Sequence, residues 1–490
     1  MRNRRIGASL AVLALLASCG GDDVFSSAPG ATGSPPTGVA PTPTPTTGCS
    51  VRERQDWAAG QLREWYLFPE TLPASLDPTP YPTVDGYIDA LTATARSQRR
   101  DRFFTFLTSI REEEAYYASG ASAGFGIRLG VDATARTAVV TEAFEGAPAL
   151  AAQVDRGTEI LAIGTTVATL RTVSAIITAE GSIGVSNALG PSTAGTTRVL
   201  RVADARGTRD VTLTKADFAL LPVSTRYGAK VITDGGRTYG YLNLRTFIST
   251  ADPALRAAFA SFRAQNVTDV IVDFRYNGGG LISTAELMGD LLGRNRATSE
   301  VFSYTVFRPD KASNNVTRLF APQSESIAPT RIAFIGTGGT ASASELVINA
   351  MVPYLHSNAG LIGTNTFGKP VGQIAFDRAA CDDRLRVVAI STQNAARQGN
   401  YYDGLAGTVE ASCRADDDIR FPLGDPREAS TRQAIDFLAG RTCTPISASP
   451  ITASARTTGQ ATTATLPSAG RELLTPDRPS TPQREVPGLF

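Results

Sequence analysis

The sequence predicts an α/β domain over residues 221–445, preceded by a β-rich domain over 116–220 and a helical region over 49–115. Three observations predict this order. After residue 228, apolar runs typical of buried strands alternate with helices. The middle segment consists of short strand-like runs separated by turns, and the first has the apolar spacing of amphipathic helices. At 490 residues the chain is long enough for two or three domains.

The N-terminus is typical of an export signal. Basic "MRNRR" precedes an apolar run, "IGASLAVLALLA", which is too short to span a membrane comfortably. The small residues of "LASC" before Cys19 resemble the lipobox of bacterial lipoproteins, which implies removal of residues 1–18 and lipidation of Cys19. An ordinary secretory signal is the alternative. Because Gly20 and not an aspartate follows Cys19, we expect a periplasm-facing protein anchored in the outer membrane.

Two segments lack the large apolar residues that a core requires. Residues 19–48 are rich in Pro, Thr, Gly and Ser and predict a tether between the lipidated cysteine and the folded body. Residues 446–490 have a similar composition at their start, and we expect them to form a disordered tail.

Charge gives no sign of a polyanionic partner. The chain has 47 basic and 46 acidic residues, without a long run of either sign. This balance argues against nucleic acid or an anionic surface as the main partner. Because only four residues are lysines, a lysine within a motif is informative.

Four cysteines remain after Cys19, which in an exported protein indicates two disulfides with three possible connectivities. We expect the pairs Cys381–Cys413 and Cys49–Cys443. A structural zinc site is not expected, since the chain has one histidine and no CxxC pair.

The β-rich segment resembles a PDZ domain of the type found in bacterial proteases. The similarity rests on "GFGI" and on "GAPALAAQVDRGTEILAIG", and a Gly/Ser/Thr-rich loop is expected at 180–196. The GFGI residues, Gly124, Phe125, Gly126 and Ile127, match the loop that holds a peptide carboxylate in such domains. The resemblance implies binding of peptide ends by strand addition. The alternative is a spacer domain whose groove is filled by its own chain.

A serine lies where a predicted strand, "RIAFIG", leads into a helix. In "TASASELVINAM", Ser342 and Glu345 have the S-x-x-E spacing of a helix capping box. The same position suits a nucleophile, because the N–H of Ala343 and the helix dipole would face a developing oxyanion. The local sequence leaves both interpretations open.

A nucleophilic serine requires a base, and the sequence offers two candidates. His356 follows the same helix about four turns on, roughly 20 Å away, and is out of reach. Lys369 has no acidic neighbour between residues 360 and 376, so burial would lower its pKa and leave the amine neutral. Gln373 could hydrogen-bond that amine without adding charge. The alternative is a solvated lysine in a surface turn.

Three glycines, Gly278 to Gly280, follow the strand-like run "VIVDF". They would let another chain approach the backbone closely and could direct an N–H into a site. A tight turn is the alternative. The segment does not match the phosphate-binding pattern G-x-x-x-x-G-K-[ST].

Taken in order, "DFRYNGGG", "TASASE" and "TFGKPVGQ" resemble the motifs of the carboxy-terminal processing peptidases, also called tail-specific proteases. The resemblance covers about residues 115–440 and implies a crotonase-like α/β peptidase domain that needs no metal or other cofactor. The implied catalytic residues are Ser342 as nucleophile, Lys369 as general base and Gln373 as its orienting partner. The oxyanion hole would be the N–H of Ala343 with that of Gly279 or Gly280, and Glu345 and Thr366 would support the site.

These motifs predict a serine endopeptidase that captures flexible or apolar C-terminal tails of exported proteins. Its partners would be polypeptide substrates and, through the lipid anchor alone, a membrane; nucleic acid is not expected. One alternative is a catalytically silent peptide- or ligand-binding lipoprotein of the same fold. A second is an ester or thioester hydrolase that uses the same oxyanion geometry.

Overall fold

The computed structural model describes residues 47–447 and 471–490. The predicted signal peptide, Cys19 and nearly all of the predicted tether lie outside the described residues. Within the described ranges, no helix is both long enough and apolar enough to cross a membrane.

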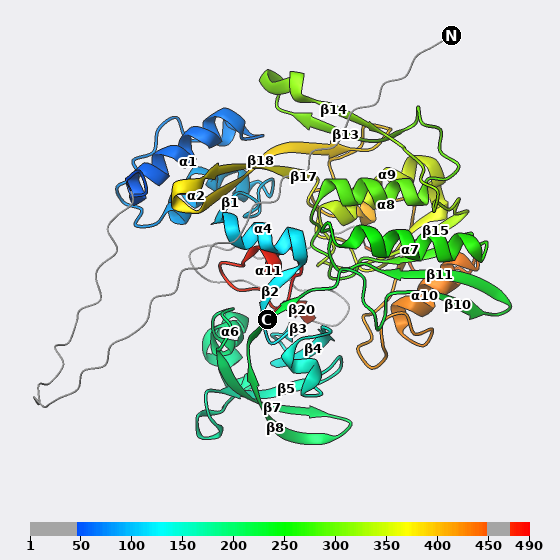
Figure 1. Ribbon diagram of the computed structural model, residues 1–490, viewed down its shortest axis with the longest axis horizontal. Helices are drawn as coiled ribbons and strands as arrows, with labels where there is room; N and C mark the ends of the chain where they lie inside the picture. Colours follow the sequence, from blue (N-terminus) through cyan, green and yellow to red (C-terminus); the bar gives the residue numbers. More distant parts are fainter. Residues whose placement is uncertain (1–46, 448–470) are drawn as a thin grey trace, which may run out of the picture. The chain divides into compact units, whose positions relative to one another are not determined.

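The first described segment is helical and packs on a β-hairpin from late in the chain (Figure 1). Ser50 caps the first helix, and Glu53 closes the capping box. Leu62 and Leu91 share an apolar cluster with Val387 and Val388 of the hairpin, which holds the helices against it. The elements of this segment are α1 (Val51–Trp65), η1 (Pro69–Thr71), α2 (Val84–Leu91), α3 (Ala93–Ser97), β1 (Phe106–Ser109) and α4 (Ile110–Ser119).

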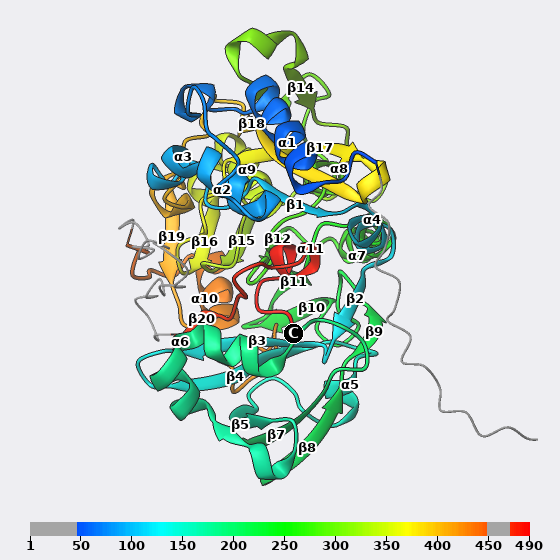
Figure 2. The same cartoon turned by 90° about the vertical axis from the view of Figure 1, so that its left-hand side faces the viewer.

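A seven-stranded sheet forms the β-rich domain, with strand order β20-β3-β4-β5-β7-β8 (Figure 2) and with β6 paired to β5. Its edge strand β20 (Arg471–Leu473) comes from the end of the chain. The segment expected to be a loop from residue 180 is instead helical to Leu189, interrupted at Gly181, because Val185 and Leu189 are buried in this domain's core. Its elements are β2 (Ala121–Gly124), β3 (Ile127–Asp132), β4 (Thr137–Ala143), α5 (Pro148–Ala151), β5 (Glu159–Gly164), η2 (Val167–Thr169), β6 (Arg171–Thr172), α6 (Val173–Leu189), β7 (Thr197–Asp204), β8 (Gly207–Thr214) and β9 (Ala216–Ala219).

The α/β domain is built on a six-stranded sheet, β10-β11-β12-β15-β16-β19, which is parallel from β11 onward. Alternate residues of each strand face opposite sides. Val270 and Val272 lie in the cluster with α7, α8 and α9, whereas Ile271 packs with α10. Its elements are β10 (Ala229–Asp234), β11 (Arg237–Asn243), α7 (Ala251–Ala264), β12 (Asp269–Asp273), α8 (Ile282–Leu292), β15 (Arg331–Gly336), α9 (Ala343–Leu355), η4 (His356–Asn358), β16 (Ala359–Gly363), η6 (Leu405–Gly407), β19 (Ala411–Arg414) and α10 (Ala429–Leu438).

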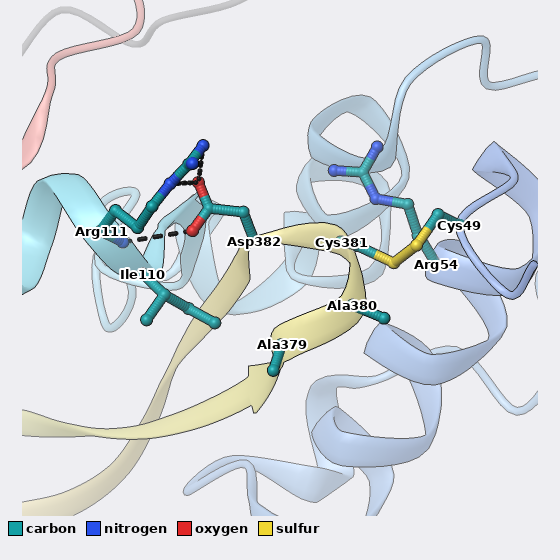
Figure 3. A pocket seen from close by; sticks show the side chains of 8 residues that line it. All are labelled: Cys49, Arg54, Ile110, Arg111, Ala379, Ala380, Cys381 and Asp382. Atoms are coloured by element: carbon teal, nitrogen blue, oxygen red, sulfur yellow. Dashed lines mark hydrogen bonds and ion pairs between the residues drawn. A yellow bond between two sulfur atoms is a disulfide. The ribbon is translucent and has the colours of Figure 1, made fainter. Parts of the chain in front are cut away.

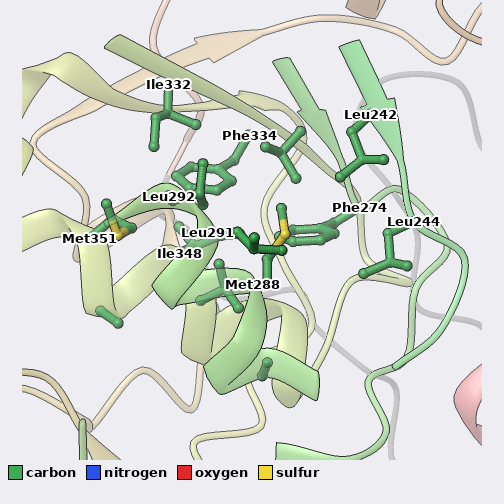
Figure 4. Packing of buried hydrophobic residues seen from close by; sticks show 14 of the residues in the cluster. Leu242, Leu244, Phe274, Met288, Leu291, Leu292, Ile332, Phe334, Ile348 and Met351 are labelled. Carbon is green, nitrogen blue, oxygen red and sulfur yellow. The ribbon is translucent and has the colours of Figure 1, made fainter. Parts of the chain in front are cut away.

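Figure 4 shows the larger of these two clusters, with Met288 and Leu291 of α8 beside Phe274 at the end of β12. A further five-stranded sheet joins β1 to strands from the second half of the chain, in the order β1-β18-β13-β14, with β17 beside β18. Its remaining elements are β13 (Val301–Phe307), η3 (Pro309–Asn314), β14 (Val316–Leu319), β17 (Val371–Arg378), η5 (Ala379–Cys381) and β18 (Asp383–Gln393).

The predicted disulfide pairing is wrong. The structure joins Cys49 to Cys381 and Cys413 to Cys443, with Cα atoms 5.5 and 5.4 Å apart. The first bond forms because the β17–β18 turn lies against the start of the helical segment, where Arg378 donates to the Glu53 carbonyl at 2.9 Å. The second forms because the chain after α10 returns beside β19, where Arg414 N–H donates to Thr444 at 2.7 Å.

The prediction of a disordered tail is also wrong for residues 471–490, which contain β20 (Arg471–Leu473) and α11 (Thr481–Glu485). Residues 448–470 lie outside the described ranges. The tail is ordered because widely spaced apolar side chains, Leu474, Val486, Leu489 and Phe490, are buried against other parts of the chain. Large apolar residues are sparse in this segment, so its composition alone did not indicate that it is buried.

Candidate active site

The three motifs predicted to act together directly follow the carboxyl ends of three adjacent parallel strands. The glycines follow β12, Ser342 follows β15 and Lys369 follows β16, in the same order as the strands lie in the sheet. Carboxyl ends of parallel strands share one edge, which is the usual position of a site in an open α/β sheet. The topology therefore brings Gly278 and Lys369, which are 91 residues apart in the sequence, to the same edge of the sheet.

Ser342 has an unusual backbone conformation, with φ 54° and ψ −114°. A non-glycine residue at positive φ is strained, and such strain is found most often at functional sites. Its N–H donates to Oε2 of Glu345 at 3.0 Å, which is one half of the predicted capping box. Ser342 is thus held in a sharp turn between a strand and the first turn of α9.

The Glu345 carboxylate is fully buried and has four hydrogen-bond donors. Oε2 accepts from the main-chain N–H of Lys369 at 2.7 Å in addition to that of Ser342. Oε1 accepts from the Thr366 hydroxyl at 2.6 Å and from Gly368 N–H at 2.7 Å. Burial raises the pKa of Glu345, and the four donors oppose that rise. One carboxylate thus fixes the Ser342 turn against the loop that carries Lys369.

The Lys369 amine donates to Oε1 of Gln373 at 3.2 Å and lies 4.9 Å from the ring centre of Phe104. The Gln373 amide nitrogen donates to the Phe104 carbonyl at 2.6 Å, which turns its oxygen toward the lysine. Burial lowers the pKa of Lys369. Among the described residues, the amine donates to Gln373 and makes no hydrogen bond to the Ser342 hydroxyl. Glu345 thus joins the loops that carry Ser342 and Lys369, but the two side chains are not hydrogen-bonded to each other.

Asn277 attaches the glycine loop to the serine turn. Its side-chain oxygen accepts from Gly279 N–H at 2.9 Å, and its nitrogen donates to the Leu244 carbonyl at 2.9 Å. Its main-chain oxygen accepts from Ala341 N–H at 3.0 Å and the Ser344 hydroxyl at 3.1 Å. A Cβ on Gly279 would lie 2.7 Å from the Ser342 Cβ, so only glycine fits there.

One of the two expected glycine donors is engaged within the loop. The Gly279 N–H is bonded to Asn277 and is not free for an oxyanion. Gly280 forms a β-bridge with Phe247, but the hydrogen bonds of this bridge use the Gly279 carbonyl and the Leu281 N–H, so the Gly280 N–H stays a candidate donor. The Gly278 N–H instead donates to a peptide carbonyl, that of Glu485 in the tail, at 2.8 Å. Gly278, which the sequence analysis did not select, is therefore the glycine whose N–H faces an incoming chain.

The GFGI segment binds the tail of the same chain. Gly126 and Ile127 donate their N–H groups to the main-chain oxygen of Phe490 at 2.9 and 3.1 Å. Phe125 is buried in the domain core, and a Cβ on Gly124 would lie 2.8 Å from the Phe490 carbonyl carbon. In this structure, the groove is filled by its own chain.

Comparison with known proteins finds a family whose model matches the part of the chain that carries these motifs. Residues 238–398 match the model of peptidase family S41, and this range contains the glycines, Ser342, Lys369 and Gln373. About half of the chain resembles curated carboxyl-terminal processing proteases, as the sequence motifs predicted.

The carboxyl-terminal-processing protease of Picosynechococcus sp. is 25% identical over 260 residues, which are 53% of this chain and 57% of that protein. The chloroplastic C-terminal processing peptidase of Tetradesmus obliquus is 29% identical over 182 residues, 35% of this chain and 36% of that protein. The chain thus spans little more than half the length of the curated relatives that it matches.

Among solved structures, a Bacteroides fragilis protein assigned to the S41 proteases superposes with a TM-score of 0.60 and 21% identity, covering 78% of this chain and 97% of that one. This likeness shows a shared mixed α/β fold. The matched family and the curated relatives are peptidases.

Three residues near the S41 motifs were not identified from the sequence. Asn277 lies inside a quoted motif, and an Asn before a run of glycines was the available signal. Arg102 donates to the Phe367 carbonyl at 2.6 Å and also to that of Gly368, which supports the loop that carries Lys369. Glu485 comes from the tail. Arg102 and Glu485 are distant in sequence and have no local signature.

His356 lies away from the S41 site, as expected. Its side chain is 66% exposed, and Nδ1 lies 2.8 Å from Glu410 Oε1. A surface hollow of about 560 Å³ is also remote from the predicted residues (Figure 3). It is lined by the Cys49–Cys381 disulfide together with Arg54, Ile110, Arg111, Ala379, Ala380 and Asp382. It contains none of the chemistry that the motifs predict.

Proposed function

We propose that the protein is a serine endopeptidase of the carboxyl-terminal processing type, with Ser342 as nucleophile and Lys369 as general base. The observation that carries the proposal is the shared Glu345 oxygen, which accepts the main-chain N–H of both residues. A buried carboxylate with four donors specifies one arrangement of these two loops. The strained backbone of Ser342 is a second feature, and it favours a catalytic role over a purely structural one.

In the proposed reaction, the neutral Lys369 amine takes the proton of the Ser342 hydroxyl as Oγ attacks a peptide carbonyl. Its hydrogen bond to Gln373 leaves the amine lone pair available for this proton. The charged oxygen of the tetrahedral intermediate would be held by the N–H of Ala343 and that of Gly278. The lysine then protonates the leaving amine, and water, deprotonated by the same lysine, hydrolyses the acyl-enzyme.

Substrates would be polypeptides with flexible C-terminal segments. The proposed PDZ-like groove would pair such a segment with β3 and hold its end at Gly126 and Ile127, in the positions now taken by the tail. We further propose that the protein is exported and lipidated at Cys19. Loss of membrane association in a Cys19→Ala variant would test the anchor.

The catalytic proposal is tested by comparing the wild type with Ser342→Ala and Lys369→Ala on unfolded casein and on a tagged protein with a small apolar tail. Each variant should lose at least about 10³-fold in kcat/KM. The exposed Ser324 and the surface lysine Lys311, each changed to alanine, serve as matched controls and should retain activity.

Cleavage that survives Ser342→Ala would overturn the assignment of the nucleophile. Wild-type protein that binds peptide tails without cleaving them would favour the silent binding protein. Faster turnover of small esters than of either polypeptide would favour the ester hydrolase.

A further inference from the structure

The tail pairs twice with the same edge of β3. In β20, Glu472 is in register with Val131 and Leu473 with Gly130. Leu129 then donates its N–H to the Gly488 carbonyl at 2.8 Å and accepts from Leu474 N–H at 2.9 Å. The edge that a bound peptide would extend is therefore paired along its length with residues of the same chain.

The last residues of the tail are also anchored by their side chains. Phe490 is 2% exposed and lies in the core of the β-rich domain. Leu489 and Val486 pack in a small cluster with Phe144 and Phe218. The tail thus fills the positions for both the backbone and the side chains of a captured peptide.

Between its two pairings with β3, the tail leaves the sheet and crosses the catalytic loops. The main-chain carbonyl of Glu485 accepts a hydrogen bond from the Gly278 N–H. A Cβ on Gly278 would lie 2.3 Å from the Arg484 carbonyl oxygen. On the other side, Arg484 donates to the Phe103 carbonyl at 3.1 Å and covers the Phe106 ring at 3.7 Å. A substrate backbone could reach the Gly278 N–H only after this segment moves away.

The tail also brings an acid toward the predicted base. The Glu485 carboxyl accepts from the Tyr117 hydroxyl at 3.0 Å, and its charge acts on Lys369 to raise the amine's pKa, against the larger effect of burial. Arg484 and Arg386 act in the opposite direction, and Asp101 acts in the same direction as Glu485. The tail therefore places two opposing charges near Lys369, since Glu485 raises the pKa of the amine and Arg484 lowers it.

We propose that residues 471–490 are an intramolecular inhibitor of the peptidase, which substrate C-termini must displace from the β3 edge. The inference rests on the proposed function, since it concerns the same site. Three groups needed for a substrate are engaged by the tail: the GFGI donors, the β3 edge and the Gly278 N–H. A tail that served only to complete the fold would have no need to cover the catalytic donor as well as the peptide groove.

The test measures peptide binding without cleavage. Full-chain protein carrying Ser342→Ala is compared with the same protein lacking residues 471–490, and with one carrying Leu489→Asp and Phe490→Asp. The probe is a fluorescent peptide with the sequence of residues 479–490, followed by anisotropy. Both altered proteins should bind it at least about tenfold more tightly, since the open fraction of the groove limits the apparent affinity. Asp477→Asn, an exposed change in the same tail, should leave the affinity unchanged.

The double variant keeps the chain length, so it decides the matter if the truncated protein fails to fold. Equal affinity in all the folded proteins would overturn the inference. So would an affinity that depends on protein concentration, because a second copy would then supply the tail. Loss of the tail from wild-type protein but not from Ser342→Ala, measured by intact mass, would make it a substrate and not an inhibitor.

Activity separates this inference from the proposed function. With Ser342 restored, the truncated protein should cleave the tailed substrate at least about tenfold faster at low concentration. Cleavage with unchanged peptide binding would overturn the inference alone. Tighter binding without cleavage in any protein would support occupancy by the tail and overturn the catalytic proposal.

Discussion

Lys369 is surrounded by groups that act on its charge in opposite directions. Burial lowers its pKa, Glu485 and Asp101 raise it, and Arg484 and Arg386 lower it. The carboxylate of Glu345 lies at the base of the same loop. It accepts hydrogen bonds from the Thr366 hydroxyl and from the main-chain N–H groups of Ser342, Gly368 and Lys369, and not from the lysine amine. The amine itself is bonded to the uncharged Gln373, which suits a lysine that must act as a base.

The pH dependence of kcat/KM should reflect the burial of Lys369 and the charged groups near it. Below its pKa, Lys369 is protonated and cannot accept the serine proton, so activity should rise with pH. Because burial lowers the pKa, the midpoint should lie below the ordinary lysine value of ~10.4. In Glu485→Gln it should lie lower still, because a charge that favours the protonated amine is removed.

These midpoints are measured from pH–rate profiles on a fluorogenic peptide. Glu114→Gln, which changes a carboxylate that is 62% exposed, is the control. A midpoint at or above the ordinary lysine value, or an upward shift in Glu485→Gln, would contradict the assignment of Lys369 as base.

At the scale of elements, the glycine loop depends on one buried side chain. Asn277 joins the loop after β12 to β11 through Leu244 and to the serine turn through Ala341. It also takes the Gly279 N–H, which leaves that of Gly278 directed at the approaching chain. The position of the proposed oxyanion donor is thus set by an amide that never contacts substrate.

Replacing Asn277 with alanine should therefore impair both stability and catalysis. The change leaves the Gly279 N–H and the Leu244 carbonyl without partners, at a cost of about 1–3 kcal/mol in unfolding free energy. A displaced Gly278 donor should lower kcat by about 10²-fold. Urea unfolding and casein hydrolysis measure the two effects, with the exposed Asn187→Ala as control. Wild-type kcat in a destabilised Asn277→Ala protein would show that the loop's position does not matter.

The sequence predicted those elements whose signals are local. The order of strand, Ser342 turn and helix, and the Lys369–Gln373 contact at four residues' separation, follow from short patterns. The disulfide pairing required knowledge of which distant segments lie side by side, and no local pattern carries that information. The tail was missed for the same reason, because β20 is stabilised by the edge of β3, which lies more than 330 residues earlier.

At the scale of the whole molecule, two disulfides close loops of very different length. Cys49 and Cys381 are 332 residues apart, whereas Cys413 and Cys443 are 30 apart. The longer loop joins the N-terminal helices to the hairpin of β17 and β18, which carries Gln373. Cross-links stabilise mainly by restricting the unfolded chain, and longer loops are restricted more.

Removing the longer loop should have the larger effect. Cys49→Ala with Cys381→Ala should lower stability by about 2–5 kcal/mol, and the matched Cys413→Ala, Cys443→Ala protein should lose less. Differential scanning calorimetry of both proteins gives the order of their melting temperatures. A higher melting temperature for the protein without the Cys49–Cys381 bond would contradict this view.

The same bond determines how the molecule would respond to tension. A pull between residues 47 and 447 enters the fold at Cys49 and passes through the covalent link to Cys381, then along the chain to Cys413 and through the second disulfide to Cys443. Everything in the chain between the two half-cystines, including helices α1 to α4, the β-rich domain and Ser342, lies off this load path. While both bonds are intact, such a force loads mainly the segment from Cys381 to Cys413 and leaves the peptidase motifs unstretched.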